Sequence, residues 1–182
     1  MTSMTPSTTP PSDIIASLFI QAVRQGQSLW FRVASDSMLP LIRRGDSVFI
    51  QPATAQEIRI GDIAAFESSD NLVIHRIVST QQVTGSIRLL QLSDVELLPS
   101  WVKEQAVVGK VVLLRRQQRQ IDLRHPIAQW WGKVTAGIRY QLYLHSTKNG
   151  PGRLLLRVCS RLTLNLGNWC LRRLCASPAP HD

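Results

Sequence analysis

Cysteine is scarce in this chain and confined to its end. The 182 residues include three cysteines, all in the last quarter: Cys159, Cys170 and Cys175. They form no Cys-x-x-Cys pair, and no histidine lies close enough in sequence to complete a local zinc knuckle. An odd cysteine count without a secretory signal indicates reduced thiols. We therefore expect no metal, no cofactor and no thiol nucleophile in the body of the chain.

Long hydrophobic runs are also missing. No window holds 18 or more uncharged apolar residues, so the sequence predicts no transmembrane helix. Residues 1–12 are rich in Thr, Ser and Pro and carry no basic residue, which is unlike a signal peptide and typical of a disordered leader. From these absences we expect a cytoplasmic protein.

Acidic residues are absent between Asp122 and Asp182, although nine Lys and Arg residues fall in that interval. The whole chain has a net charge of +9. A basic, apolar stretch that also contains Trp can contact a membrane surface, a nucleic acid or an acidic partner, and a solvated helical face is the simpler alternative. Among these partners we expect peripheral membrane contact and no nucleic acid.

The apolar pattern divides the chain into three parts. Residues 1–12 form the leader, residues 13–116 a β domain that begins with one helix, and residues 117–182 a basic helical extension. The first helix begins at Ser12 or Asp13 and ends at Gly26, because apolar residues from Ile14 to Val23 recur at helical spacing. In the extension, residues 127–144 and 153–174 read as two helices, with a boundary to the β domain near residues 117–124.

Between residues 29 and 116, short runs rich in Val and Ile alternate with turn residues. Several strands at close spacing without an intervening long helix predict a mainly β, antiparallel sheet or barrel-like domain. Two turns repeat a Gly-Asp pair, Gly45-Asp46 and Gly61-Asp62, and we interpret both aspartates as structural. The predicted strands are 29–33, 47–51, 63–68, 72–80, 87–91 and 107–116.

Two residues between these strands could carry chemistry. Ser37 lies between a predicted strand and Pro40, and His75 lies inside an apolar strand. A serine hydroxyl needs a base within hydrogen-bond reach to act as a nucleophile, and histidine is the commonest such base. Residue types alone favour the simpler interpretation, in which Ser37 is a loop serine and His75 a strand histidine whose hydrogen bonds are satisfied.

The order of motifs favours the chemical interpretation. Ser-Asp-Ser-Met-Leu-Pro (residues 35–40) is followed by a Gly-Asp turn, a strand, a second Gly-Asp turn and a strand containing His75-Arg76, and then by Val-Val-Gly-Lys-Val (residues 107–111). Over residues 27–115 this order resembles the type I signal peptidases, in particular their histidine-type branch. The wider superfamily includes the LexA-like self-cleaving repressors.

The resemblance implies a role for each matching residue. Ser37 would be the nucleophile, His75 the general base and Asp94 the group that orients His75. Ser35 and the Ser37 N–H would form the oxyanion hole, and Met38 and Pro40 would line the substrate cleft. Ser93 departs from the glycine that the family places before this aspartate, and the alternative is that Asp94 bonds the backbone of its own turn. The acidic Asp36 beside the nucleophile would raise the pKa of His75 by favouring the imidazolium, and the alternative is that its carboxylate is simply solvated.

The resemblance implies a serine endopeptidase that cleaves a leader or signal-type peptide or protein precursor after a small residue. The alternative is a non-catalytic or self-acting LexA-like regulatory or binding module, with a tail that binds membrane or nucleic acid. A repressor would need a helix-turn-helix and an Ala-Gly or Cys-Gly bond before Ser37. That segment contains one predicted helix and neither dipeptide.

Overall fold

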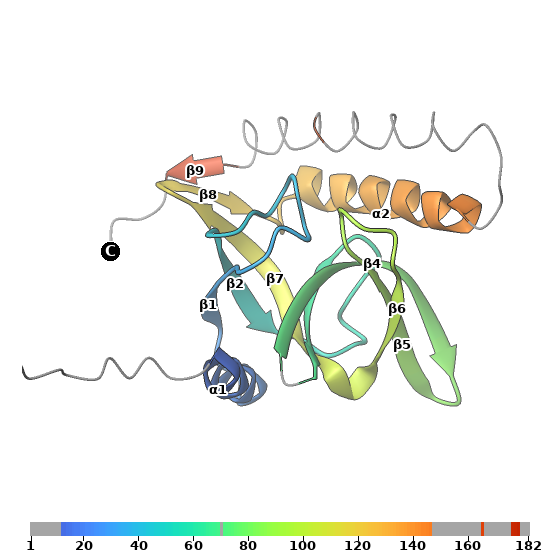
Figure 1. Ribbon diagram of the computed structural model, residues 1–182, viewed down its shortest axis with the longest axis horizontal. Helices are drawn as coiled ribbons and strands as arrows, with labels where there is room; N and C mark the ends of the chain where they lie inside the picture. The colour runs from blue at the N-terminus through green and yellow to red at the C-terminus, as the bar shows by residue number, and fades with distance from the viewer. Residues whose placement is uncertain (1–11, 70, 147–164, 166–175, 179–182) are drawn as a thin grey trace, which may run out of the picture.

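The computed structural model describes residues 12–69, 71–146, 165 and 176–178 (Figure 1). Residues 1–11 of the predicted leader lie outside this part of the chain, as do the three cysteines. So does the second predicted basic helix, apart from Asn165.

The strands form one curled antiparallel sheet, which confirms the predicted fold class (Figure 1). Its strand order is β1-β2-β7-β3-β4-β5-β6, with β8 added to β7 and β9 added to β8. Six strands match the predicted ones closely, and the three that were not predicted (β6, β8 and β9) have only three or four residues each. The bounds are β1 (Leu29–Arg32), β2 (Ser47–Pro52), β3 (Ile63–Ser68), β4 (Asn71–Val83), β5 (Ser86–Leu92), β6 (Ser100–Lys103), β7 (Val107–Arg116), β8 (Arg119–Asp122) and β9 (Ala176–Pro178), with a 3-10 turn at Glu104–Ala106 before β7.

Helix α1 (Ser12–Arg24) is an amphipathic helix packed against the sheet. Its buried residues are Ala16, Ile20 and Val23, at the spacing that one helical face requires. Ile14, Ile15 and Leu18, which belong to the apolar residues whose spacing predicts the helix, remain about half exposed.

Helix α2 (Pro126–Ser146) confirms the first predicted basic helix. Its start is fixed by His125, whose carbonyl accepts the Gln129 N–H and whose ring Nδ1 accepts the Ile127 N–H. The predicted boundary near residues 117–124 falls within the β7–β8 hairpin, so the sheet continues through it. Helix α2 then packs on β4.

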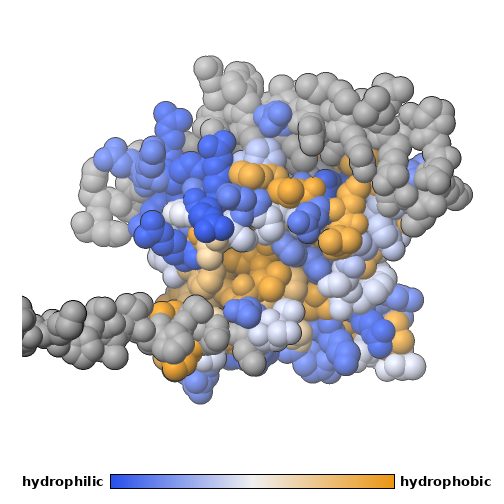
Figure 2. All heavy atoms as spheres, in the orientation of Figure 1, coloured by the Kyte–Doolittle hydropathy of each residue, from blue (hydrophilic) through white to orange (hydrophobic). Residues whose placement is uncertain are grey.

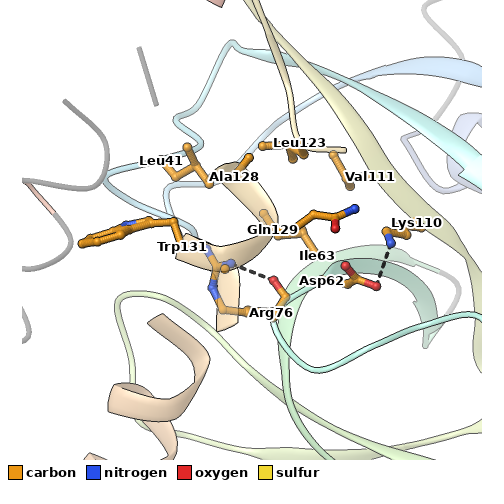
Figure 3. Close-up of a pocket in the computed structure, with 12 residues that line it drawn as sticks. Leu41, Asp62, Ile63, Arg76, Lys110, Val111, Leu123, Ala128, Gln129 and Trp131 are labelled. Atoms are coloured by element: carbon orange, nitrogen blue, oxygen red, sulfur yellow. Dashed lines mark hydrogen bonds and ion pairs between the residues drawn. The ribbon is translucent and has the colours of Figure 1, made fainter. Parts of the chain in front are cut away.

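The contact between α2 and the sheet depends on two glycines. Gly61 precedes β3 with a φ of +97°, and a Cβ at Gly132 of α2 would lie 2.7 Å from the Gly61 carbonyl oxygen. Figure 3 shows Ala128, Gln129 and Trp131 of α2 among the residues that line a small cavity beside this contact. The backbone approach leaves no room for a side chain, which brings α2 close to the strand that carries His75.

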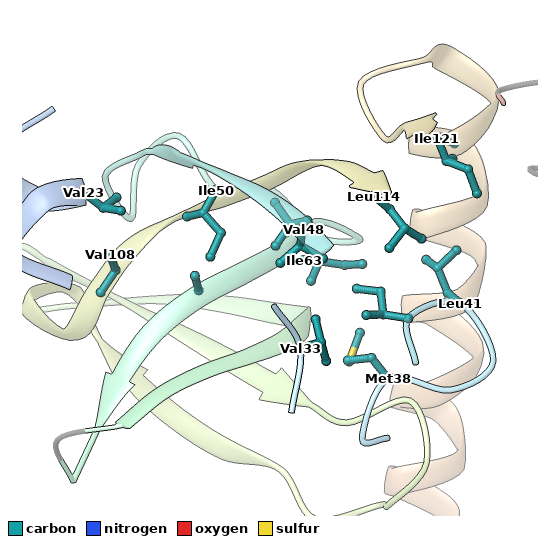
Figure 4. Close-up of a cluster of buried hydrophobic side chains, with 14 of the residues drawn as sticks. Val23, Val33, Met38, Leu41, Val48, Ile50, Ile63, Val108, Leu114 and Ile121 are labelled. Carbon is teal, nitrogen blue, oxygen red and sulfur yellow. The ribbon is translucent and has the colours of Figure 1, made fainter. Parts of the chain in front are cut away.

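The core consists of one large apolar cluster and two smaller ones. The large cluster joins β2, β3 and β7 to α1 and to the segment after β1, as Figure 4 shows. Met38 is 2% exposed and lies in this cluster. The buried Met38 side chain therefore anchors the chain around Ser37 to the core.

The two Gly-Asp turns share one structural design, as predicted. Asp46 accepts the Arg43 N–H and Asp62 accepts the Arg59 N–H, both at 2.8 Å. Each aspartate also forms an ion pair with a basic residue of β7, Asp46 with Arg116 and Asp62 with Lys110. Both turns are thus held to β7, the strand that pairs with β2 on one side and with β3 on the other.

Candidate active site

Ser37 begins a tight turn that follows an extended stretch after β1. The stretch is held at Val33, whose N–H donates to the Asp46 carbonyl and whose own carbonyl accepts the Gly45 N–H, both at 2.8 Å. The turn closes with the Leu39 N–H bonded to the Asp36 carbonyl at 3.2 Å. Ser37 is left partly exposed above the buried Met38.

Ser35 and Ser37 lie on the same side of this segment. Their hydroxyl oxygens are 3.3 Å apart, a separation at which one hydroxyl can donate to the other. Within the part of the chain that the structure describes, the Ser37 N–H has no hydrogen-bond partner. The predicted oxyanion-hole groups therefore lie beside the predicted nucleophile.

His75 lies on β4 opposite Ala64 of β3 and is partly buried. Its ring Nδ1 is 2.5 Å from Oε1 of Gln91, and the Gln91 amide nitrogen donates to the Ser100 hydroxyl at 2.7 Å. An amide oxygen only accepts hydrogen bonds, so Nδ1 carries the proton and donates it. The unprotonated nitrogen of neutral His75 is then Nε2, the tautomer that a general base needs.

Burial lowers the pKa of His75 below its ordinary value. The hydrogen bond to Gln91 and the charges of Asp94 and Glu96 act in the opposite direction but do not outweigh burial. Of the two interpretations of Asp36, the structure agrees with a solvated carboxylate and not with one that raises this pKa: Asp36 is exposed, and its carboxylate accepts the Arg44 N–H at 2.9 Å. At neutral pH the buried imidazole is held in its uncharged, proton-accepting form.

Asp94 occupies a different place from the one predicted. Both of its carboxylate oxygens accept from the Arg76 guanidinium, at 2.9 and 2.7 Å, and both side chains are buried. Arg76 also donates to the Gly61 carbonyl at 3.0 Å (Figure 3). The hydrogen-bond partner of His75 is therefore Gln91, and Asp94 contributes to the imidazole only through its charge.

Sequence reasoning missed Gln91 because a glutamine in a strand carries no chemical signature. The relation between the two residues lies in the strand register, which the structure shows. Gln91 pairs with Ile77, two residues along β4 from His75, and so lies diagonally across the same face of the sheet.

Ser37 and His75 line one apolar groove of about 690 Å³. Figure 2 shows apolar side chains gathered in a hollow on the face above α1. Phe19 and Phe31 meet edge to face on its wall, with ring centroids 5.1 Å apart. Ser35 and Met38 also line the groove, whereas the predicted cleft residue Pro40 lies outside its lining. The remaining apolar lining comes from α1, β1, β4 and the segment after β1, including Ile15, Leu72, Val73 and Ile74.

Two strand edges flank the groove without a partner in the described part of the chain. β1 pairs only with β2 and ends the sheet. Residues 71–75 of β4 pair only with β3, because pairing with β5 begins at Arg76. Unpaired edges of this kind accept an extended peptide as an added strand.

Comparison with known proteins places the chain in a family. The family model described as Peptidase S24-like matches residues 7–112, more than half of the chain. The chain belongs to this family, and therefore to the signal peptidase and LexA-like superfamily that its sequence resembles. No curated protein matches the chain significantly. Helix α2 lies beyond the matched residues.

No helix in the described ranges is long and apolar enough to cross a bilayer.

Proposed function

We propose that this protein is a serine endopeptidase with Ser37 as nucleophile and His75 as general base. The observation that carries the proposal is that both residues line one apolar groove while Gln91 holds His75 with Nε2 unprotonated. Membership of a peptidase-like family supports the same reaction class.

In the proposed reaction, the Ser37 oxygen attacks the carbonyl carbon of the scissile bond and its proton passes to His75 Nε2. The developing oxyanion is stabilised by the Ser37 N–H and the Ser35 hydroxyl, each on the order of 3 kcal/mol. His75 then gives the proton to the departing amine. Water, deprotonated by the same imidazole, hydrolyses the acyl-enzyme ester.

The substrate that best fits the groove is an extended peptide. Main-chain pairing with β1 and with residues 71–75 of β4 would supply affinity, and the apolar wall would select side chains. We propose a leader or signal-type segment of a precursor, cleaved after a small residue. Ser35 and Met38 would face the bond being cut, because they line the groove beside Ser37.

The proposal predicts covalent labelling of Ser37 by a fluorophosphonate, in which the Ser37 oxygen displaces fluoride at phosphorus. We expect Ser37→Ala to abolish labelling without changing the unfolding midpoint, and His75→Ala to slow it by about 10²- to 10⁴-fold. Intact-protein mass spectrometry measures the adduct. Full labelling of His75→Ala between pH 6 and 9 would remove the proposed base.

A folded wild-type protein that never reacts would favour the other candidate, a non-catalytic or self-acting binding module. Family membership is the observation that keeps this candidate open, because the superfamily includes LexA-like regulators. A cleaved chain that accumulates without added substrate and disappears in Ser37→Ala would identify the self-acting form.

A further inference from the structure

We propose that Arg139 of helix α2 is a positioning residue for Ser37, acting through the loop at residues 93–96. This inference rests on the proposed function, because it assigns a supporting residue to the proposed nucleophile. Arg139 lies outside residues 7–112, which the family model matches. Three consecutive contacts join Arg139 to the Ser37 segment.

The first contact joins the loop to the nucleophile segment. The Ser93 hydroxyl donates to the Ser37 carbonyl at 2.6 Å, and the Val95 N–H donates to the same oxygen at 3.2 Å. A peptide unit is planar, so fixing this carbonyl also fixes the Met38 N–H and restricts rotation about the Ser37 backbone. The direction of the Ser37 hydroxyl thus depends on where the loop lies.

The second contact holds the loop in shape. The Ser93 hydroxyl accepts the N–H groups of Val95 and Glu96, both at 3.1 Å. A glycine at position 93 could make none of these side-chain bonds. Where the family has a flexible glycine, this chain therefore has a hydroxyl that hydrogen-bonds three backbone groups: the Ser37 carbonyl and the N–H groups of Val95 and Glu96.

The third contact fixes the loop to α2. One terminal nitrogen of Arg139 donates to the carbonyls of Ser93 and Glu96, both at 2.6 Å. Arg139 is 5% exposed, and burial lowers its pKa, which the charge of Asp94 partly opposes. A guanidinium kept charged at such a buried place is costly unless its hydrogen bonds are made. The two loop carbonyls supply them for one terminal nitrogen, whereas Nε of Arg139 is buried without a hydrogen-bond partner in the described part of the chain.

The loop also reaches the base. Between the two carbonyls that Arg139 holds, Asp94 pairs with Arg76, the chain neighbour of His75. A single helix residue therefore sets the position of a loop that touches the Ser37 segment at one side and the His75 strand at the other. Its loss is expected to misplace the nucleophile relative to the base.

The test uses the full-length chain with Arg139→Met, Arg139→Lys and Leu142→Ala. Leu142 is a buried α2 residue that makes none of the loop contacts, so its truncation controls for loss of helix packing. At a temperature where all variants are folded, we expect Arg139→Met to slow fluorophosphonate labelling of Ser37 by about 10- to 100-fold. Arg139→Lys should recover part of the rate and Leu142→Ala should match the wild type.

Amide hydrogen exchange gives a readout that does not need activity. We expect the Val95 amide to exchange about tenfold faster in Arg139→Met and unchanged in Leu142→Ala. Equal labelling rates for Arg139→Met and the wild type would overturn the inference, as would an unchanged Val95 amide. A wild-type protein that fails to react, with Val95 still loosened in Arg139→Met, would overturn the proposed function and the catalytic part of the inference but leave the loop contact established.

Discussion

At the scale of single residues, the orientation and tautomer of His75 are set by the neutral amide of Gln91, whereas the resemblance implies the carboxylate of Asp94 in that role. Gln91 fixes the tautomer without adding charge, and burial keeps the imidazole pKa low. A base of this kind stays unprotonated, and so competent, below the pH at which an ordinary histidine becomes charged. The acid side of the pH profile for Ser37 labelling should therefore lie below the usual value for histidine.

Gln91→Glu tests this control. A carboxylate beside Nδ1 favours the imidazolium, so the pKa of His75 rises and activity is lost at a higher pH as the solution is acidified. We expect the acid limb of the labelling rate to move upward by about one to two pH units. A limb that stays in place would show that Gln91 does not govern the protonation of His75.

The sequence allowed Ser37, His75 and Ser35 to be assigned to one site because their spacing follows a recognisable order of motifs. It could not show the partner of His75, because that depends on register between β4 and β5. The sequence also suggested Asp94 as the partner of His75. No local pattern in the sequence reveals that the buried Arg76, next to His75, donates to both carboxylate oxygens of Asp94.

At the scale of elements, the strands and α1 follow from apolar periodicity and turn residues, and their bounds shift by three residues or fewer. The short strands β6 and β8 were missed because their few residues carry too little pattern to distinguish them from loops. The packing of α2 could not be predicted either. It depends on Gly132, which in sequence reads as a weak point in a helix, meeting Gly61.

Two glycines of α2 offer a matched comparison. A Cβ at Gly132 would press on the backbone of Gly61, whereas a Cβ at Gly137 meets nothing within 4 Å. We expect Gly132→Ala to lower the free energy of unfolding by about 1–3 kcal/mol. Gly137→Ala should raise it by about 0.5–1 kcal/mol, because alanine favours the helix. Urea unfolding followed by circular dichroism measures both, and equal shifts would refute the close contact.

At the scale of the whole molecule, charge is distributed unevenly along the chain. Residues 147–182 contain six of the 21 Lys and Arg residues and one of the 12 acidic residues. Trp130 of α2 is 59% exposed, and its ring lies 5.5 Å from that of Trp131. Cationic charge attracts the protein to anionic lipid, and an exposed Trp favours the interface. We propose that the basic extension makes peripheral contact with anionic membranes.

Vesicle sedimentation separates this contact from a solvated basic surface. The full chain should pellet with phosphatidylglycerol vesicles at low salt and not with phosphatidylcholine vesicles. Binding should weaken steeply as salt is raised towards 0.5 M, since surface charges are screened beyond a few ångströms there. Trp130→Ser should weaken binding and leave its salt dependence unchanged, because the substitution removes interfacial burial without removing charge. No pelleting with either lipid would leave the extension as a solvated surface, and equal pelleting with both would refute a contact driven by its charge.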